Sequence, residues 1–108
     1  MDKATKSKAE QIRNFLAKVS VAEPNQISIL VSQSVNRMLQ AVYNNQTADE
    51  QAILSTKHHN GTGFNAMDAT FLSEVAQRSI KYNTLTVKQT RSVAKSLRKY
   101  ALQIAMVA

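Results

Sequence analysis

The chain has 108 residues, a formal net charge of +7, 44% hydrophobic residues and no cysteine. Its length suits one domain, and the lack of cysteine excludes disulfides, thiolate metal sites and cysteine nucleophiles. Two glycines and one proline favour helices over strands, and the short apolar stretches lead us to expect a cytoplasmic protein with no membrane partner.

Hydrophobic periodicity predicts two helices in the first half of the chain. Apolar residues recur at helical spacing from about Thr5 to Val21. Pro24, which suits the first turn of a helix, precedes a second amphipathic segment that extends to about Tyr43. We expect this second helix to be the central core element. Its apolar positions are Ile27, Leu30, Val31, Val35, Met38, Leu39 and Val42.

Capping residues predict where the next helices begin. Thr47, with Glu50 three residues later, forms a capping box for a short third helix. The stretch "KHHNGTGFN", residues 57–65, then predicts a loop. Asn65 caps a helix over residues 66–81. The apolar positions expected to face the core there are Met67, Phe71, Leu72, Val75 and Ile80.

The last helix begins with the same capping pattern. Thr86 as N-cap and Gln89 three residues later form a capping box, and the helix should extend from there to about Met106. Asn83 suits a left-handed turn before it. We therefore expect an all-α fold, a compact bundle of about five helices in a single domain (1–108) that ends in a helical hairpin with a basic last helix.

Positive charge is concentrated at the end of the chain. Residues 1–74 hold seven Lys or Arg and seven acids, whereas residues 75–108 hold seven bases and no acid. At 100° per residue, five of these bases lie within about a third of the circle of the last helix. They are Lys88, Arg91, Lys95, Arg98 and Lys99, opposite an apolar arc of Val93, Leu97, Tyr100 and Ile104.

A basic face without acids has two interpretations. It can be a solubilising face, or a face that binds an anion such as nucleic acid or an acidic protein surface. Like charges four residues apart destabilise a helix, and no acid compensates them here, which favours the second interpretation. We expect the following nucleic-acid-binding residues: Arg78, Lys81, Lys88, Gln89, Arg91, Lys95, Arg98 and Lys99.

The last two predicted helices allow two ways of meeting nucleic acid. As a helix-turn-helix, they would place Lys88, Gln89 and Arg91 near base edges in the major groove. As a plain αα-hairpin, they would let the basic face contact phosphates without reading bases. Tyr82, in the turn, is a better candidate for stacking on bases than Tyr100, which lies on the apolar arc.

The remaining polar motifs do not predict catalysis. His58 and His59 are adjacent in a loop, where side chains diverge, and no nearby carboxylate pair completes a metal site. The "HNGTGF" stretch lacks the lysine and preceding strand of a P-loop. No nucleophile, base and orienting acid recur at a recognisable spacing. We expect a protein that is not an enzyme and takes no metal or cofactor.

Residues 58–104 carry a family resemblance. The stretches "HNGTGFNAMDATFLSEVAQ" and "LTVKQTRSVAKSLRKYALQI" resemble a small helical module that accompanies phage and bacterial superfamily 2 helicases, and are similar to the short proteins encoded beside the recombination helicase of T-even phages. Thr84 stands where that family commonly has glycine. The matching positions are Gly63, Phe64, Asn65, Asp68, Ala69, Phe71, Leu72, Leu85, Thr86, Lys88, Gln89, Lys95, Leu97, Lys99, Tyr100 and Gln103.

The resemblance implies a role near nucleic-acid processing, with a helicase as one candidate partner, and leaves residues 1–57 as a helical half without assignment. Our leading hypothesis is a phage-type accessory protein that binds nucleic acid, DNA before RNA, in replication, recombination or repair. The alternative is an anti-defence or host-takeover inhibitor whose basic face docks on an acidic or nucleic-acid-binding surface of a host enzyme. A phage-encoded chain would act in the host cytoplasm.

Overall fold

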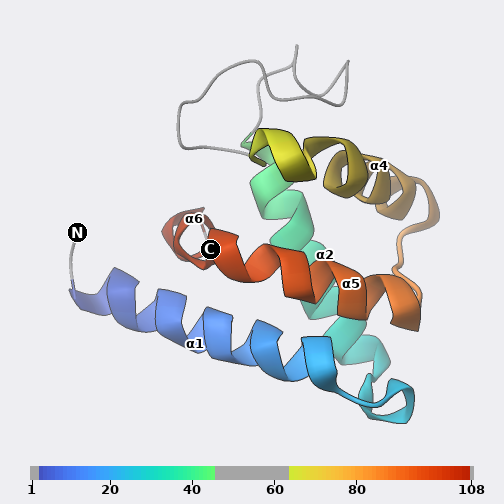
Figure 1. The fold of residues 1–108 in the computed structure, drawn as a ribbon, viewed down its shortest axis with the longest axis horizontal. Helices are drawn as coiled ribbons and strands as arrows, with labels where there is room; N and C mark the ends of the chain where they lie inside the picture. The colour runs from blue at the N-terminus through green and yellow to red at the C-terminus, as the bar shows by residue number, and fades with distance from the viewer. Residues whose placement is uncertain (1–2, 46–63, 108) are drawn as a thin grey trace.

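A computed structural model describes residues 3–45 and 64–107, and within these ranges the chain forms helices joined by short turns, with no strand. The predicted all-α bundle is therefore confirmed. The helices are α1 (Lys3–Val21), α2 (Ile29–Asn44), α4 (Ala66–Tyr82), α5 (Val87–Leu97) and α6 (Ala101–Val107), with 3-10 turns η1 (Pro24–Gln26) and η2 (Arg98–Tyr100) (Figure 1). The predicted helix at Thr47 and Glu50, the histidine pair and the loop up to residue 63 lie outside the described residues.

The second helix begins later than predicted. Its N-cap is Ser28, whose Oγ accepts a hydrogen bond from the backbone N–H of Val31 at 3.2 Å, so α2 starts at Ile29. Pro24 instead begins η1. The prediction of one helix from Pro24 is wrong because the fixed φ of proline suits the first residue of a 3-10 turn as well as that of an α-helix.

Helices from the two ends of the chain lie together in the fold. In Figure 1, α1 and α5 lie side by side and run in opposite directions, and α2 crosses behind them. α4 packs against the C-terminal half of α2, and α6 packs against α1 and α2. The first and last thirds of the chain therefore share one core, instead of forming two separate halves.

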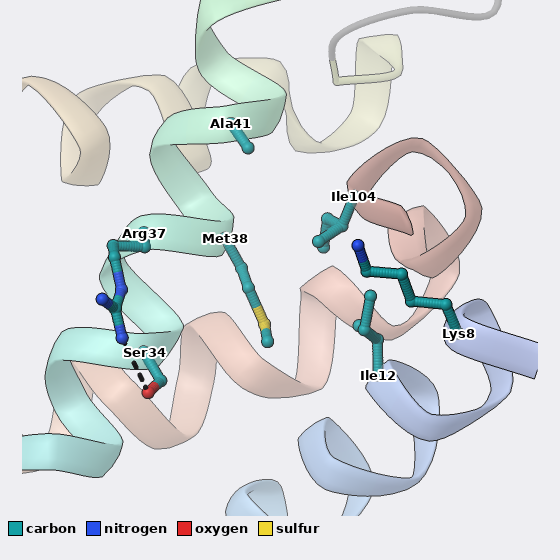
Figure 2. A pocket seen from close by; sticks show the side chains of 7 residues that line it. All are labelled: Lys8, Ile12, Ser34, Arg37, Met38, Ala41 and Ile104. Carbon is teal, nitrogen blue, oxygen red and sulfur yellow. Dashed lines mark hydrogen bonds between the residues drawn. The ribbon is translucent and has the colours of Figure 1, made fainter. Parts of the chain in front are cut away.

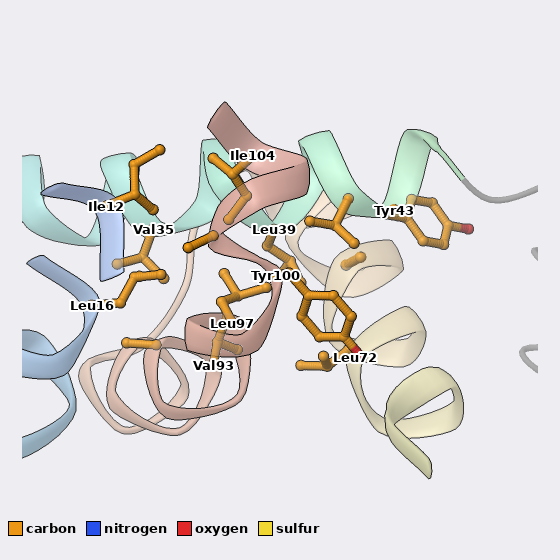
Figure 3. Packing of buried hydrophobic residues seen from close by; sticks show 14 of the residues in the cluster. Ile12, Leu16, Val35, Leu39, Tyr43, Leu72, Val93, Leu97, Tyr100 and Ile104 are labelled. Atoms are coloured by element: carbon orange, nitrogen blue, oxygen red, sulfur yellow. The ribbon is translucent and has the colours of Figure 1, made fainter. Parts of the chain in front are cut away.

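That core is apolar and draws on every α-helix that the structure describes (Figure 3). Leu16, Leu39 and Leu97 have no exposed surface, and burial of each such side chain stabilises the fold by roughly 1.5–3 kcal/mol. Most apolar positions predicted in the second helix are buried or partly buried, but Leu30 is 73% exposed. It lies in the first turn of α2, with its side chain facing solvent.

α4 presents a face of small residues to α2, and this face was not predicted. Its buried positions include Ala69, Leu72, Ser73, Val75, Ala76 and Ser79. At this interface Gln40 Nε2 donates to Ser79 Oγ at 2.6 Å and to the carbonyl oxygen of Ala76 at 3.0 Å. The prediction of which apolar residues of this helix face the core is correct for Leu72 and Val75. It is wrong for Met67, Phe71 and Ile80, which are 91%, 48% and 59% exposed.

The last predicted helix is interrupted. Asn83 adopts the expected left-handed conformation, with φ 56° and ψ 30°, and α5 then runs only to Leu97 before η2 and α6. The prediction of one continuous helix to Met106 is wrong because residues 98–100 tighten into a 3-10 turn that the 3.6-residue periodicity does not reveal. The turn joins α4 to α5 as expected, but α5 packs against α1 and α2 more than against α4.

Candidate nucleic-acid interface

The N-terminus of α5 is held by a complete capping box. Thr86 Oγ1 accepts from the backbone N–H of Gln89 at 3.1 Å, and Gln89 Oε1 accepts from the backbone N–H of Thr86 at 2.9 Å. The predicted cap is confirmed. The side-chain oxygen of Gln89, which we expected to contact a base edge, is therefore engaged by its own helix.

A buried hydrogen bond sets the rotation of α5. Thr90 Oγ1 is hydrogen-bonded to the carbonyl oxygen of Thr86 at 2.8 Å and to Ser32 Oγ on α2 at 3.0 Å. Thr90 shares the inward face of α5 with Val93, Ala94 and Leu97, all buried. Because residues three and four apart share a helix face, the basic side chains lie outside this inward face, with Lys88 and Lys95 exposed and Arg91 half-buried.

These basic side chains line an open groove between the end of α1 and the outer face of α5. The groove has a volume of about 270 Å³ and is lined by Ser20, Lys88, Arg91, Ser92 and Lys95, the set that we call the basic groove. Three cations and two hydroxyl groups surround it, and none of the acids in the described part of the chain lines it. Its volume lies just below the roughly 300–1,000 Å³ typical of small-molecule pockets, so it suits a small charged group.

The charge balance of the basic groove indicates what the groove could bind. Among the described residues, no carboxylate lies within salt-bridge distance of Lys88, Arg91 or Lys95. Arg91 is half-buried, and its Nε is a buried donor without a hydrogen-bond acceptor in the described part of the chain. An anion in the groove would offset the repulsion among its three cations.

Arg98 and Lys99, the last two bases of the predicted basic face, have different surroundings from the other three. Lys99 Nζ forms a salt bridge with Asp68 Oδ2 at 2.8 Å, so its charge is compensated across space from the start of α4. The expectation that no acid balances the bases after residue 75 is therefore wrong for Lys99. Arg98 is exposed in η2 and does not line the basic groove. The 3-10 turn takes both residues out of the regular α5 register.

Arg78 and Lys81 lie on a separate surface at the end of α4. They line a hollow of about 570 Å³ with Glu74, Gln77 and Tyr82, so a carboxylate accompanies these two cations. Lys81 Nζ lies 5.4 Å from the centre of the Tyr82 ring, which is 62% exposed. The structure thus divides the predicted site: Arg78 and Lys81 do not join Lys88, Arg91 and Lys95.

Tyr100 belongs to the core, as expected. It is 4% exposed, and its ring packs edge-on against Phe64 with 5.7 Å between centroids. Its hydroxyl donates to Asp68 Oδ2 at 2.6 Å and accepts from the backbone N–H of Asn65 at 3.0 Å. Burial, reinforced by the hydrogen bond to Asp68, raises the pKa of Tyr100 well above its ordinary value near 10.

The sequence did not point to Ser20 as part of this site. Ser20 lies near the end of α1, almost seventy residues before Lys88, and meets it only because α1 and α5 run antiparallel. Its hydroxyl donates to the carbonyl oxygen of Ala17 at 2.8 Å, which leaves its oxygen as an acceptor in the groove. Serine at a helix end is common, so no local pattern distinguishes it.

Comparisons with protein-family models, with curated proteins and with solved structures find no match to this chain. In the described part of the chain, no three His, Asp or Glu side chains gather as a metal site would require. None of the helices there has the length and apolar character needed to cross a bilayer.

Proposed function

We propose that this protein is a non-catalytic accessory protein that binds nucleic acid through the basic groove, with Lys88, Arg91 and Lys95 contacting phosphates. The observation that carries the proposal is the clustering in one concavity of three cations that have no carboxylate partner among the described residues. Phosphate oxygens accept hydrogen bonds from arginine and lysine, and such contacts supply most of the affinity of nonspecific nucleic-acid binding.

The geometry favours recognition of the phosphate backbone over recognition of base sequence. Gln89, the side chain best suited to adenine, has its oxygen occupied in the capping box. α5 packs along α1 instead of standing free, and Ser20 of α1 forms the opposite wall of the groove. These features support phosphate contacts more than insertion of α5 as a recognition helix.

The resemblance to helicase-associated modules supports a role in DNA replication, recombination or repair, as a phage-type accessory factor. In such a role the protein would act where DNA strands are exchanged or unwound, and a helicase is then one candidate partner. The alternative, an inhibitor that docks its basic face on a host enzyme, uses the same cations against an acidic protein surface. Binding to isolated DNA separates the two.

The test is the salt dependence of DNA affinity, measured by fluorescence anisotropy on a labelled duplex and a labelled single strand. If the three groove cations neutralise three phosphates, the slope of log K against log salt on the duplex should be about −3. Arg91→Gln with Lys95→Gln should weaken binding to all sequences alike and flatten this slope by about 2.

The matched control is Lys3→Gln with Lys6→Gln, which removes two exposed charges from the opposite end of α1, about 20 Å or more from Ser20 along the helix. It should leave the slope unchanged. Equal slopes in the two double variants would show that DNA affinity depends on the total positive charge of the protein and not on the basic groove. No DNA or RNA binding by the parent at low salt would remove the proposal and favour the inhibitor.

A further inference from the structure

A second groove lies on a different face of the molecule, between α1, α2 and α6. It has a volume of about 460 Å³, within the range of functional binding sites. Figure 2 shows Met38 reaching from α2 toward Ile12 of α1 and Ile104 of α6, with Ala41 on the same side of α2. We call this the apolar groove. It shares no residue with the basic groove.

The lining of the apolar groove follows helical spacing. Ser34, Arg37, Met38 and Ala41 recur along one face of α2, and Lys8 and Ile12 lie four apart on α1. The walls are thus two helices with a trough between them, open to solvent along one side. A second helix laid in such a trough buries apolar residues at its i, i+3, i+4 and i+7 positions.

Its charged lining residues carry a single sign. Among the described residues, the charged side chains that line the groove are Arg37, on α2, and Lys8, on α1, and both are cations. Lys8 already makes an interaction within the chain, whereas the one hydrogen bond of Arg37 within the described part of the chain is to a neighbouring serine. Figure 2 places them on opposite sides of the apolar floor. Arg37 is exposed, and the hydrogen bond from its Nη2 to Ser34 Oγ is long at 3.4 Å. Its guanidinium can therefore turn to a carboxylate on an incoming chain at little cost.

The shape and charge of this groove define its occupant. We propose that the apolar groove binds an acidic amphipathic helix of a partner protein, with the apolar stripe of that helix on Met38 and Ala41 and its Glu or Asp residues toward Arg37. Methionine suits such a surface because its flexible thioether adapts to different apolar side chains. The two grooves lie toward opposite ends of α1, so the protein would hold nucleic acid and a partner helix together.

The test uses a display library of amphipathic helices on the full chain, without nucleic acid. The apolar stripe is held constant, and the flanking positions are drawn from Glu, Gln and Lys. Selection should enrich Glu on the flanks. A selected peptide should bind Arg37→Glu about tenfold more weakly than the parent, and replacing its facing Glu with Lys should restore binding to that variant.

Two further variants test whether the peptides bind at the apolar groove. Lys81→Glu reverses an exposed charge on α4, away from the groove, and should leave peptide affinity unchanged. Ala41→Gln places a polar side chain in the trough while keeping a good helix former, and should weaken the binding of every selected peptide. Circular dichroism of each variant verifies the fold.

The proposal is overturned if the selection returns no binder, or returns mainly basic helices. It is equally overturned if the selected peptides bind Arg37→Glu and Ala41→Gln with the same affinity as the parent. It is also overturned if the chain self-associates through this face, which sedimentation would show as a fall in mass on Arg37→Glu. None of these outcomes bears on the basic groove, whose test is made with DNA.

Discussion

At the scale of single residues, the hydroxyl of Tyr100 joins two segments that are more than thirty residues apart. It binds the carboxylate of Asp68 and the backbone N–H of Asn65, and Lys99 binds the same carboxylate. Phe64 packs on the Tyr100 ring. These contacts fix the start of α4 against η2.

We predict that Tyr100→Phe keeps the ring packing but lowers the free energy of unfolding by about 1–3 kcal/mol, because the N–H of Asn65 and the carboxylate of Asp68 lose a buried partner. Urea unfolding followed by circular dichroism measures the change. Tyr82→Phe is the control, since that ring is 62% exposed and should change stability by less than about 0.5 kcal/mol. Equal losses in the two variants would contradict the account.

The raised pKa of Tyr100 predicts how the free energy of unfolding changes at alkaline pH. Burial raises the pKa of Tyr100 in the folded state, so above the ordinary tyrosine pKa near 10 the unfolded chain binds fewer protons than the folded one. The free energy of unfolding should therefore fall as pH rises beyond about 10, and fall less in Tyr100→Phe. Parallel profiles for the parent and Tyr100→Phe would argue against this linkage.

At the scale of elements, α4 shows how a helix can bury small side chains and expose large ones. Its buried positions include Ala69, Ser73 and Ala76, and Gln40 of α2 donates hydrogen bonds to Ala76 and Ser79 of α4. Met67 and Phe71 lie on the other side of the helix. Small residues allow α4 and α2 to approach closely, which places the groups bonded by Gln40 within reach.

We expect Leu72→Ala to lower the free energy of unfolding by about 2–5 kcal/mol, because Leu72 is fully buried and its removal leaves a cavity. Met67→Ala should change it by less than about 0.5 kcal/mol, since that side chain is 91% exposed. Chemical denaturation of the two variants in parallel measures both changes. A large loss for Met67→Ala would show that the face of α4 is assigned wrongly.

Helix starts could be predicted from the sequence where the signal is local. Asn65 and Thr86 cap their helices through bonds to residues three positions later, so the pattern and the contact lie in the same few residues. The inward face of α4 could not be predicted in the same way. Hydrophobicity favours Met67 and Phe71, whereas close packing against α2 selects alanine and serine, and that selection depends on the partner helix.

At the scale of the whole molecule, the antiparallel packing of α1 and α5 creates the candidate interface. The sequence predicted Lys88, Arg91 and Lys95 as one basic face, and the structure brings them together. It could not show Ser20 as the opposite wall, nor Asp68 as the partner of Lys99, because both are contacts between elements distant in sequence. The candidate site therefore holds fewer cations than the predicted basic face, and it is a groove between two helices instead of one helix face.

The most direct test of the central claim maps bound DNA on the protein by backbone amide chemical shifts. On titration with a short duplex and then a single strand at low salt, we predict that the largest shifts fall on the basic groove, at Ser20, Lys88, Arg91, Ser92 and Lys95. Residues of the apolar groove, such as Met38 and Ala41, should stay within noise. Shifts concentrated at the apolar groove or on α4, or no shifts with either DNA, would contradict the account.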